Sequence, residues 1–139
     1  LDRIEQIRLL AGKKMGMGDV NGKVLPKVSL LSKSINKNSI ISRYFTPYSC
    51  HETHAVTGTC CVASSCLIPG TIGFNLLKKN EGLDLQSEII KIEHPMGTID
   101  CAIVLNSNFK NNLILKKDLI KSCGIYRTSR ILMKGQVYF

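Results

Sequence analysis

The sequence contains no tryptophan, only four tyrosines and four phenylalanines, and no long run of basic residues. Its formal net charge is nevertheless +9 over 139 residues, because lysine and arginine are scattered along the whole chain. Nucleic-acid-binding domains usually concentrate basic residues on one face or carry a recognisable motif. We therefore expect a solvated basic surface and no nucleic-acid partner, while a small anionic ligand would suit this charge.

No secretion signal, membrane span or CxxC pair is visible in the sequence. Charged residues occur in every turn of the first seventeen residues, unlike in a signal peptide. The uncharged stretch Ala55–Leu77 could cross a bilayer by length, but Pro69-Gly70 and Gly73 interrupt it. We expect a cytoplasmic protein with no membrane partner, and its six cysteines are expected to be thiols whose irregular spacing supports no zinc ribbon.

Hydrophobic periodicity predicts a single α+β domain. We expect a helix over Asp2–Lys14, strands over Val24–Leu31 and Ser39–Phe45, and a central helix that follows Thr46–His51 and stops before Pro69. Two hairpins are expected after it. The first pairs Ser87–Glu93 with Thr98–Ser107, and the second pairs Ile125–Met133 with Val137–Phe139. Between them, Gly70–Gln86 is expected to be a loop, and Asn106–Lys121 a polar segment with a short helix at its end. A mixed sheet curled in a barrel-like way around a buried central helix fits this list.

The central helix is the most informative prediction, because small residues dominate it and its entrance is polar. A helix without a polar face is normally buried on all sides. Its N-terminus carries unpaired N–H groups and partial positive charge, which can hold an anion. Two interpretations stay open: a purely structural core helix, and an anion-binding mouth.

Four segments carry a recognisable pattern, in the order IRLLAGKKMGMGDV (Ile7–Val20) with LPKV (Leu25–Val28), HETHAVTGTCCVAS (His51–Ser64) with PGT (Pro69–Thr71), IEHPMG (Ile92–Gly97) and RTSRILMKGQVY (Arg127–Tyr138). In these segments the chain resembles the C-terminal half of the PrpF family, the methylaconitate cis–trans isomerases and oxalomesaconate tautomerases. The resemblance implies half of a diaminopimelate-epimerase-like fold, in which two similar domains enclose the active site. Residues 1–139 would form the C-terminal domain, with an interdomain helix at 1–18.

The resemblance also implies an activity: cofactor-independent proton transfer that isomerises a double bond in aconitate-type tricarboxylates or related unsaturated acids. It places the principal acid/base residues, a Lys and a Cys, in an N-terminal half that this chain does not contain. The expected partners are therefore that missing domain and a small acid substrate, with homo-oligomerisation left open. The fragment alone is expected to be inactive, and the alternative is a non-enzymatic anion-binding remnant of the same fold.

Five residues are expected to line the substrate mouth: Ser49, Cys50, His51, Thr57 and Gly58. Hydroxyl and imidazole groups could donate hydrogen bonds to carboxylates, and a glycine permits close backbone approach. No catalytic residue is assigned in this half, although Cys50 is a candidate because a helix dipole lowers a thiol pKa. Ala55 stands where the resemblance to epimerases would place a catalytic cysteine, so epimerase chemistry is not expected.

The remaining polar groups are given mainly structural roles. Cys50, His51 and His54 could approach one metal ion, but no fourth ligand is evident, so no metal site is expected. His94 is interpreted as a turn residue. Arg127 and Arg130 could bind a carboxylate or be solvated strand residues, and both interpretations stay open. Three further cysteines are interpreted as small core hydrophobes, namely Cys60, Cys61 and Cys66.

Overall fold

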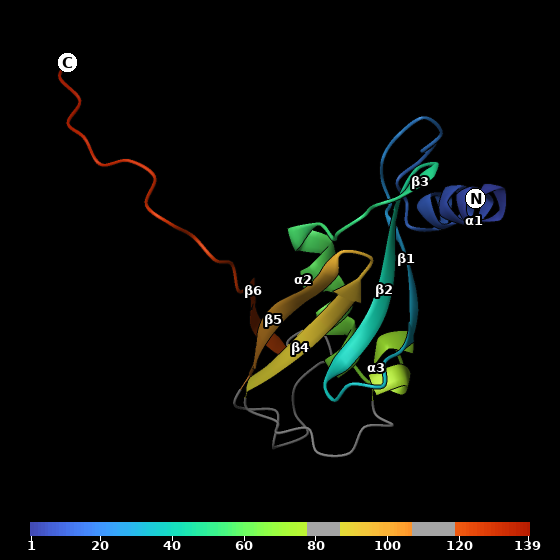
Figure 1. Ribbon diagram of the computed structural model, residues 1–139. Helices are drawn as coiled ribbons and strands as arrows, with labels where there is room; N and C mark the ends of the chain where they lie inside the picture. Colours follow the sequence, from blue (N-terminus) through green and yellow to red (C-terminus); the bar gives the residue numbers. More distant parts are fainter. Residues whose placement is uncertain (78–86, 107–118) are drawn as a thin grey trace.

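The computed structural model describes residues 1–77, 87–106 and 119–139, and it shows an α+β arrangement built on one six-stranded mixed sheet (Figure 1). The elements are α1 (Asp2–Lys14), β1 (Val28–Lys33), β2 (Ser39–Thr46), β3 (Ser49–Cys50), α2 (Val56–Leu67), α3 (Ile72–Leu77), β4 (Ser87–His94), β5 (Gly97–Leu105) and β6 (Ile120–Ile125). The α+β class predicted from the sequence is confirmed.

The strands are ordered β1-β2-β4-β5-β6, and the short strand β3 pairs with β2. All pairings are antiparallel except that of β2 with β4, where Ser39–Ile41 runs parallel to Lys91–Glu93. A parallel pair needs a long crossover, and here the crossover includes α2 and α3. Within the described residues β1 and β6 are the outer strands, so this part of the sheet is open rather than a closed barrel.

The core lies between the sheet and the two crossover helices. Helix α2 packs against β4, β5 and β6, and α3 packs against α2, β1 and β2. The core side chains are buried, and they are Ile40, Val62, Ala63, Cys66, Leu67, Leu77, Ile90, Ile92, Cys101, Ile103, Leu105 and Leu119. Strand β5 alternates as predicted, with its odd-numbered residues from Ile99 to Leu105 facing inward. Complete burial of the central helix is wrong, because Val56, Thr57 and Cys61 of α2 are exposed.

Helix α3 occupies residues that were expected to be a loop, and that expectation is wrong for Ile72–Leu77. The hydroxyl of Thr71 accepts a hydrogen bond from the amide of Phe74 at 3.1 Å, which satisfies one free donor of the first turn. A side chain at Gly73 would collide with Ser65 of α2, so a residue without a Cβ lets the two helices approach closely. The Thr-x-Gly pattern after Pro69-Gly70 therefore starts a short helix. The rest of the expected loop, residues 78–86, lies outside the described residues.

Helix α1 has the predicted bounds, and a buried arginine holds it to the rest of the chain. Its buried residues are Arg8 and Gly12, while Ile7 and Leu10 are more than half exposed. The Arg8 guanidinium donates to the carbonyls of Val20 and Leu25 at 2.9 and 2.6 Å, and it forms a bidentate ion pair with Glu5. The buried arginine therefore fastens α1 to the loop that precedes β1.

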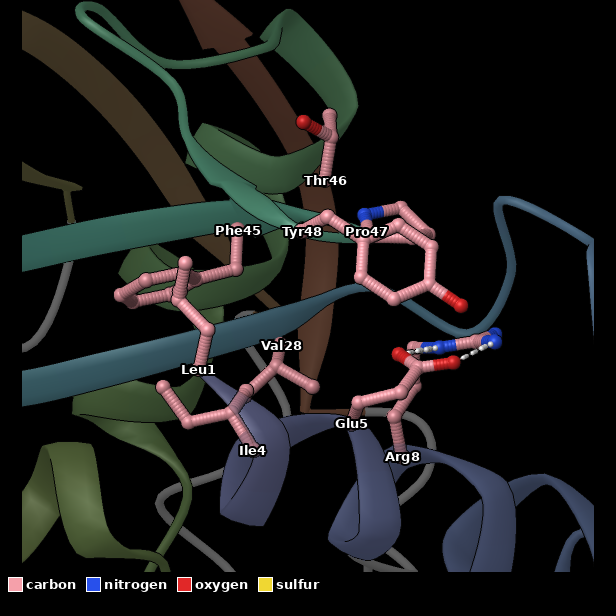
Figure 2. A pocket seen from close by; sticks show the side chains of 9 residues that line it. All are labelled: Leu1, Ile4, Glu5, Arg8, Val28, Phe45, Thr46, Pro47 and Tyr48. Carbon is pink, nitrogen blue, oxygen red and sulfur yellow. Dashed lines mark hydrogen bonds and ion pairs between the residues drawn. The ribbon is translucent and has the colours of Figure 1, made fainter.

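Figure 2 shows the hollow between α1 and the β1–β2 edge. The Glu5–Arg8 pair lies on one side of it, below Tyr48, and Leu1, Ile4, Val28 and Phe45 lie on the other. The hollow holds only about 10 Å³, too little for a substrate. It is a packing seam, and it leaves the opposite, apolar face of α1 uncovered.

Two other segments differ from the sequence prediction. Strand β1 begins at Val28 rather than at Val24, because Pro26 cannot donate to a strand ladder and the Leu25 carbonyl bonds to Arg8. The expected short helix at the end of Asn106–Lys121 is wrong at Ile120–Lys121, which belong to β6, and residues 107–118 lie outside the described part.

The expected C-terminal hairpin is also wrong. Strand β6 pairs with β5, and residues 126–139 contain no strand. Figure 1 shows this segment leading away from the sheet. Three of its apolar side chains, Ile131, Leu132 and Met133, are more than 80% exposed, so they contribute nothing to the described core. Each helix of the described residues is too short or too polar to cross a membrane.

Candidate functional site at the start of helix α2

The polar residues expected at the helix entrance form part of the sheet instead. Ser49 and Cys50 make up β3, which pairs with Thr46 and Phe45 after a turn with a positive φ of 71° at Tyr48. The chain then leaves the sheet, and α2 begins only at Val56. A helix starting directly after Thr46–His51 is therefore wrong, because the backbone of this segment is used for a two-stranded hairpin.

Two exposed hydrogen-bonding groups follow from this hairpin. The hydroxyl of Ser49 is 2.8 Å from that of Thr46, so the two orient each other. The His51 backbone amide donates a hydrogen bond to the Tyr44 carbonyl at 2.7 Å. The Nδ1 atom of the His51 ring accepts a hydrogen bond from the Thr53 amide at 3.1 Å. Since Nδ1 accepts, the proton of the neutral imidazole is on Nε2. His51 therefore presents a donor on an exposed ring, which suits a carboxylate ligand.

His54 is held in a buried network, unlike His51. Its Nδ1 lies 3.3 Å from the Ala55 carbonyl and 3.1 Å from Thr59 Oγ1, and that hydroxyl itself donates to Ala55. Both neighbours of Nδ1 are thus acceptors, so Nδ1 carries the proton and Nε2 accepts from the Ser42 hydroxyl at 3.0 Å. Burial lowers the pKa of His54, and repulsion from His94 and His51 adds to this effect. His54 is a neutral residue that ties the start of α2 to β2.

Tyr44 connects the two parts of the candidate site. Its ring meets His51 edge-on at a centroid distance of 6.4 Å and lies 4.5 Å from the His54 ring. It also covers Gly58, where an added Cβ would be only 2.5 Å from the tyrosine ring. The space beside Gly58 is therefore filled by Tyr44, which gives this glycine a packing role on that side of the helix.

Thr57 and Gly58 line an open groove of about 470 Å³. Its other walls come from the loop after α1, from β1 and from the exposed face of α2, and they include Met15, Met17, Leu25, Pro26, Lys27, Ser29, Tyr44, Cys61, Val62 and Ser65. The groove is mostly apolar, and Lys27 is the cationic residue among those that line it. Ser49, Cys50 and His51 do not line it, so the structure divides the five predicted residues into two groups with Tyr44 between them.

The N-terminus of α2 adds positive potential to this region. Ala55 is the N-cap residue, it receives no side-chain cap among the described residues, and the first turn has no acidic residue. The Thr59 amide is the first to bond within the helix, at 2.7 Å from the Ala55 carbonyl. The amides before it have no intrahelical partner and favour an anion. Glu52, exposed just upstream, opposes this locally.

The other residues singled out from the sequence have varied positions. His94 accepts the Met96 amide in the β4–β5 turn, as expected. Arg127 and Arg130 lie in the exposed segment after β6, and Arg127 borders a shallow hollow of about 320 Å³ with Asp100. Cys66 is a buried core residue, whereas a core position for Cys61 is wrong because it is exposed.

Sequence reasoning missed the residues that organise this region. Tyr44 and Ser42 were treated only as strand residues, and Lys27 received no role. Alternation along β2 could have signalled Ser42 and Tyr44, because they share its buried face with Ile40. A buried serine in such a row needs a partner, and here His54 supplies it.

Comparison with known proteins places the chain in a family. The family model described as "PrpF protein" matches residues 1–139. The protein YbhH of Escherichia coli is 38% identical over 138 residues, which is 99% of this chain and 36% of the relative. The 4-oxalomesaconate tautomerase of Pseudomonas putida is 35% identical over 135 residues, which is 97% of this chain and 34% of the relative. The 3-methylitaconate isomerase of Eubacterium barkeri is 30% identical over 99 residues, which is 71% of this chain and 22% of the relative. The chain thus spans about a third of the length of the first two relatives, and it belongs to the PrpF family.

Proposed function

We propose that this chain is the C-terminal half of a PrpF-type isomerase that shifts or rotates a double bond in aconitate-type tricarboxylates or related unsaturated acids. The observation that carries the proposal is the family match over the whole chain, together with relatives named as an oxalomesaconate tautomerase and a methylitaconate isomerase. The relatives are about three times as long, which leaves room for a second domain.

In this proposal the present half binds and polarises carboxylates. The Nε2–H of His51, the hydroxyls of Ser49 and Thr57 and the free amides near Gly58 are donors for oxygens that gain charge as a proton leaves the substrate. Preorganised donors of this kind stabilise a developing oxyanion strongly. The other domain supplies the acid and base, Cys50 remains a candidate thiol, and no cofactor is required.

The uncovered face of α1 fits a position between two domains. Ile7 and Leu10 are 54% and 63% exposed, and the groove next to Gly58 opens beside the loop that follows this helix. We propose that residues 1–18 lie at an interdomain junction, and that the open sheet is half of a diaminopimelate-epimerase-like pair. The second domain would then cover the apolar surface of α1 and complete the site.

The decisive experiment uses the native polypeptide that contains this chain. Its intact mass is measured first, and isomerisation of aconitate-type acids is then followed for the wild type, His51→Ala and Ser49→Ala. A hydrogen bond to a charged group contributes about 1.5–3 kcal/mol, so each variant should lose at least about ten-fold in kcat/KM. The control is His94→Gln, an imidazole in the β4–β5 turn, which should retain the wild-type rate. Unchanged kinetics in both site variants would remove these residues from the proposal.

The alternative is an anion-binding remnant without turnover. The uncapped start of α2 and Lys27 in the groove favour it, since both attract carboxylates without needing an acid or base. Calorimetric titration of the native polypeptide with tricarboxylates distinguishes the two. Binding with no turnover, in a polypeptide close to the mass of this chain, supports the remnant, whereas turnover supports the isomerase.

A further inference from the structure

Three cysteine thiols from different elements meet beside the core. Cys60 comes from α2, Cys101 from β5 and Cys123 from β6, and their three sulfur atoms lie within 4.8 Å of one another. In the β5–β6 register, Cys123 is paired with Ile103 and Cys101 with Ile125. The two cysteines are therefore diagonal neighbours on one face, and their sulfur atoms are 3.3 Å apart.

The surroundings distinguish this cluster from ordinary buried cysteine. Cys66, in the same helix as Cys60, is isolated in the core and donates its thiol to the Val62 carbonyl at 3.3 Å. In the cluster, by contrast, the thiols face one another, and the Cys123 sulfur is 3.8 Å from the Cys60 carbonyl. Cys101 is a fully buried core residue, while Cys60 and Cys123 are half-buried and pack against the core, so the cluster lies at the margin of the core.

The spacing suits coordination of a single ion. With metal–sulfur bonds of about 2.3 Å, three sulfurs in a plane around one ion are about 4 Å apart. The observed separations, from 3.3 Å to at most 4.8 Å, bracket that value and need only side-chain adjustment. Among the described residues no His, Asp or Glu joins the group, and apolar core residues pack beside it. Zinc favours four ligands, whereas soft ions favour thiolates.

We propose that Cys60, Cys101 and Cys123 form a three-thiolate site for one soft metal ion of the Cu(I) or Cd(II) type. Burial raises the pKa of Cys60 and of Cys101, so these thiols carry protons in the metal-free chain. Binding replaces each S–H bond by a sulfur–metal bond and releases the proton to solvent. The oxidation state of the ion does not change, and no oxidant is required. The site shares no residue with the five predicted to line the substrate mouth, and it does not depend on the proposed isomerase activity.

The test titrates the native polypeptide, fully reduced and free of oxygen, with Cd(II) and separately with Cu(I) in competition with a chromogenic chelator. We expect one ion per chain at this site and an ultraviolet thiolate-to-metal absorption band. Cys60→Ser, Cys101→Ser and Cys123→Ser should each reduce the affinity by more than about ten-fold, since even indirect support of a metal ligand has that effect. Cys60→Ser and Cys123→Ser are the milder changes for folding, because both cysteines are half-buried, whereas Cys101 is fully buried.

Cys61→Ser is the matched control, because Cys61 is the next residue of the same helix but is exposed. It should keep both the band and the affinity. The proposal is overturned if the band is absent, if the Cys61 variant loses as much affinity as the others, or if removal of the cluster cysteines has no effect. It is equally overturned if peptide mapping of the native protein finds Cys101 and Cys123 joined as a disulfide. Circular dichroism of each variant confirms that the fold is retained.

Discussion

Replacement of Gly58 by alanine tests whether this glycine is required for packing under Tyr44. The added Cβ would be 2.5 and 2.9 Å from two carbons of the tyrosine ring, so the ring must move. Overpacking of this kind costs about 1–3 kcal/mol. Alanine in a helix recovers about 0.8–1.0 kcal/mol relative to glycine. The expected net effect is a decrease of about 1 kcal/mol in the free energy of unfolding.

A double-mutant cycle with Tyr44→Leu isolates the clash. Without the tyrosine ring, Gly58→Ala should be neutral or should stabilise the chain by up to about 1 kcal/mol, which leaves only the helix preference of alanine. Urea unfolding followed by far-ultraviolet circular dichroism measures all four proteins, since the chain has no tryptophan to report by fluorescence. If alanine has the same effect with and without the ring, the packing explanation is refuted. If alanine at this position weakens acid binding in both backgrounds, Gly58 also serves the ligand.

Two further predictions concern His54 and the core. The folded-state pKa of His54 lies below the ordinary value of 6.5, so between these two pKa values the unfolded chain takes up the proton before the folded chain does. The free energy of unfolding should therefore decrease as the pH is lowered through this window. His54 changes the free energy of unfolding by at most about 1.4 kcal/mol per pH unit, and by less where solvent screens its charge. Urea unfolding at a series of pH values should show this contribution in the wild type and not in His54→Gln. Ile90→Ala should lower the free energy of unfolding by about 2–5 kcal/mol, whereas Ile89→Ala, at a position 45% exposed, should cost much less; equal losses in urea unfolding would contradict the packing described for β4.

Local patterns were sufficient where one element carries its own signal. Helix α1 has acidic residues in its first turn, basic residues in its last and glycines after its end, and its bounds were predicted correctly. The β4–β5 hairpin was predicted from alternation and from the turn at Pro95-Met96. Strand β2 was predicted to within one residue. In each case the residues that decide the structure lie within a few positions of one another.

The errors arise where distant segments compete for the same residues. The burial of Arg8 in α1 could not be predicted, because this arginine reaches carbonyls 12 and 17 positions away, which no helical periodicity reveals. The helix entrance was misplaced because Ser49 and Cys50 pair with β2 before α2 can begin. Ile131 and its neighbours look like a strand, but strand formation needs a partner, and residues 127–139 pair with no strand of the described sheet.

The sequence by itself determined the basic charge, the α+β class, the bounds of α1 and the motifs that place the chain in the PrpF family. Only the tertiary structure decided which polar groups meet. It set His51 on the surface and His54 in a buried network with Ser42, although the two histidines are three positions apart. It also brought together Cys60, Cys101 and Cys123, whose irregular spacing had suggested unrelated thiols. Spacing along the chain reports contacts only within one element, whereas these groups meet because α2 packs across β5 and β6.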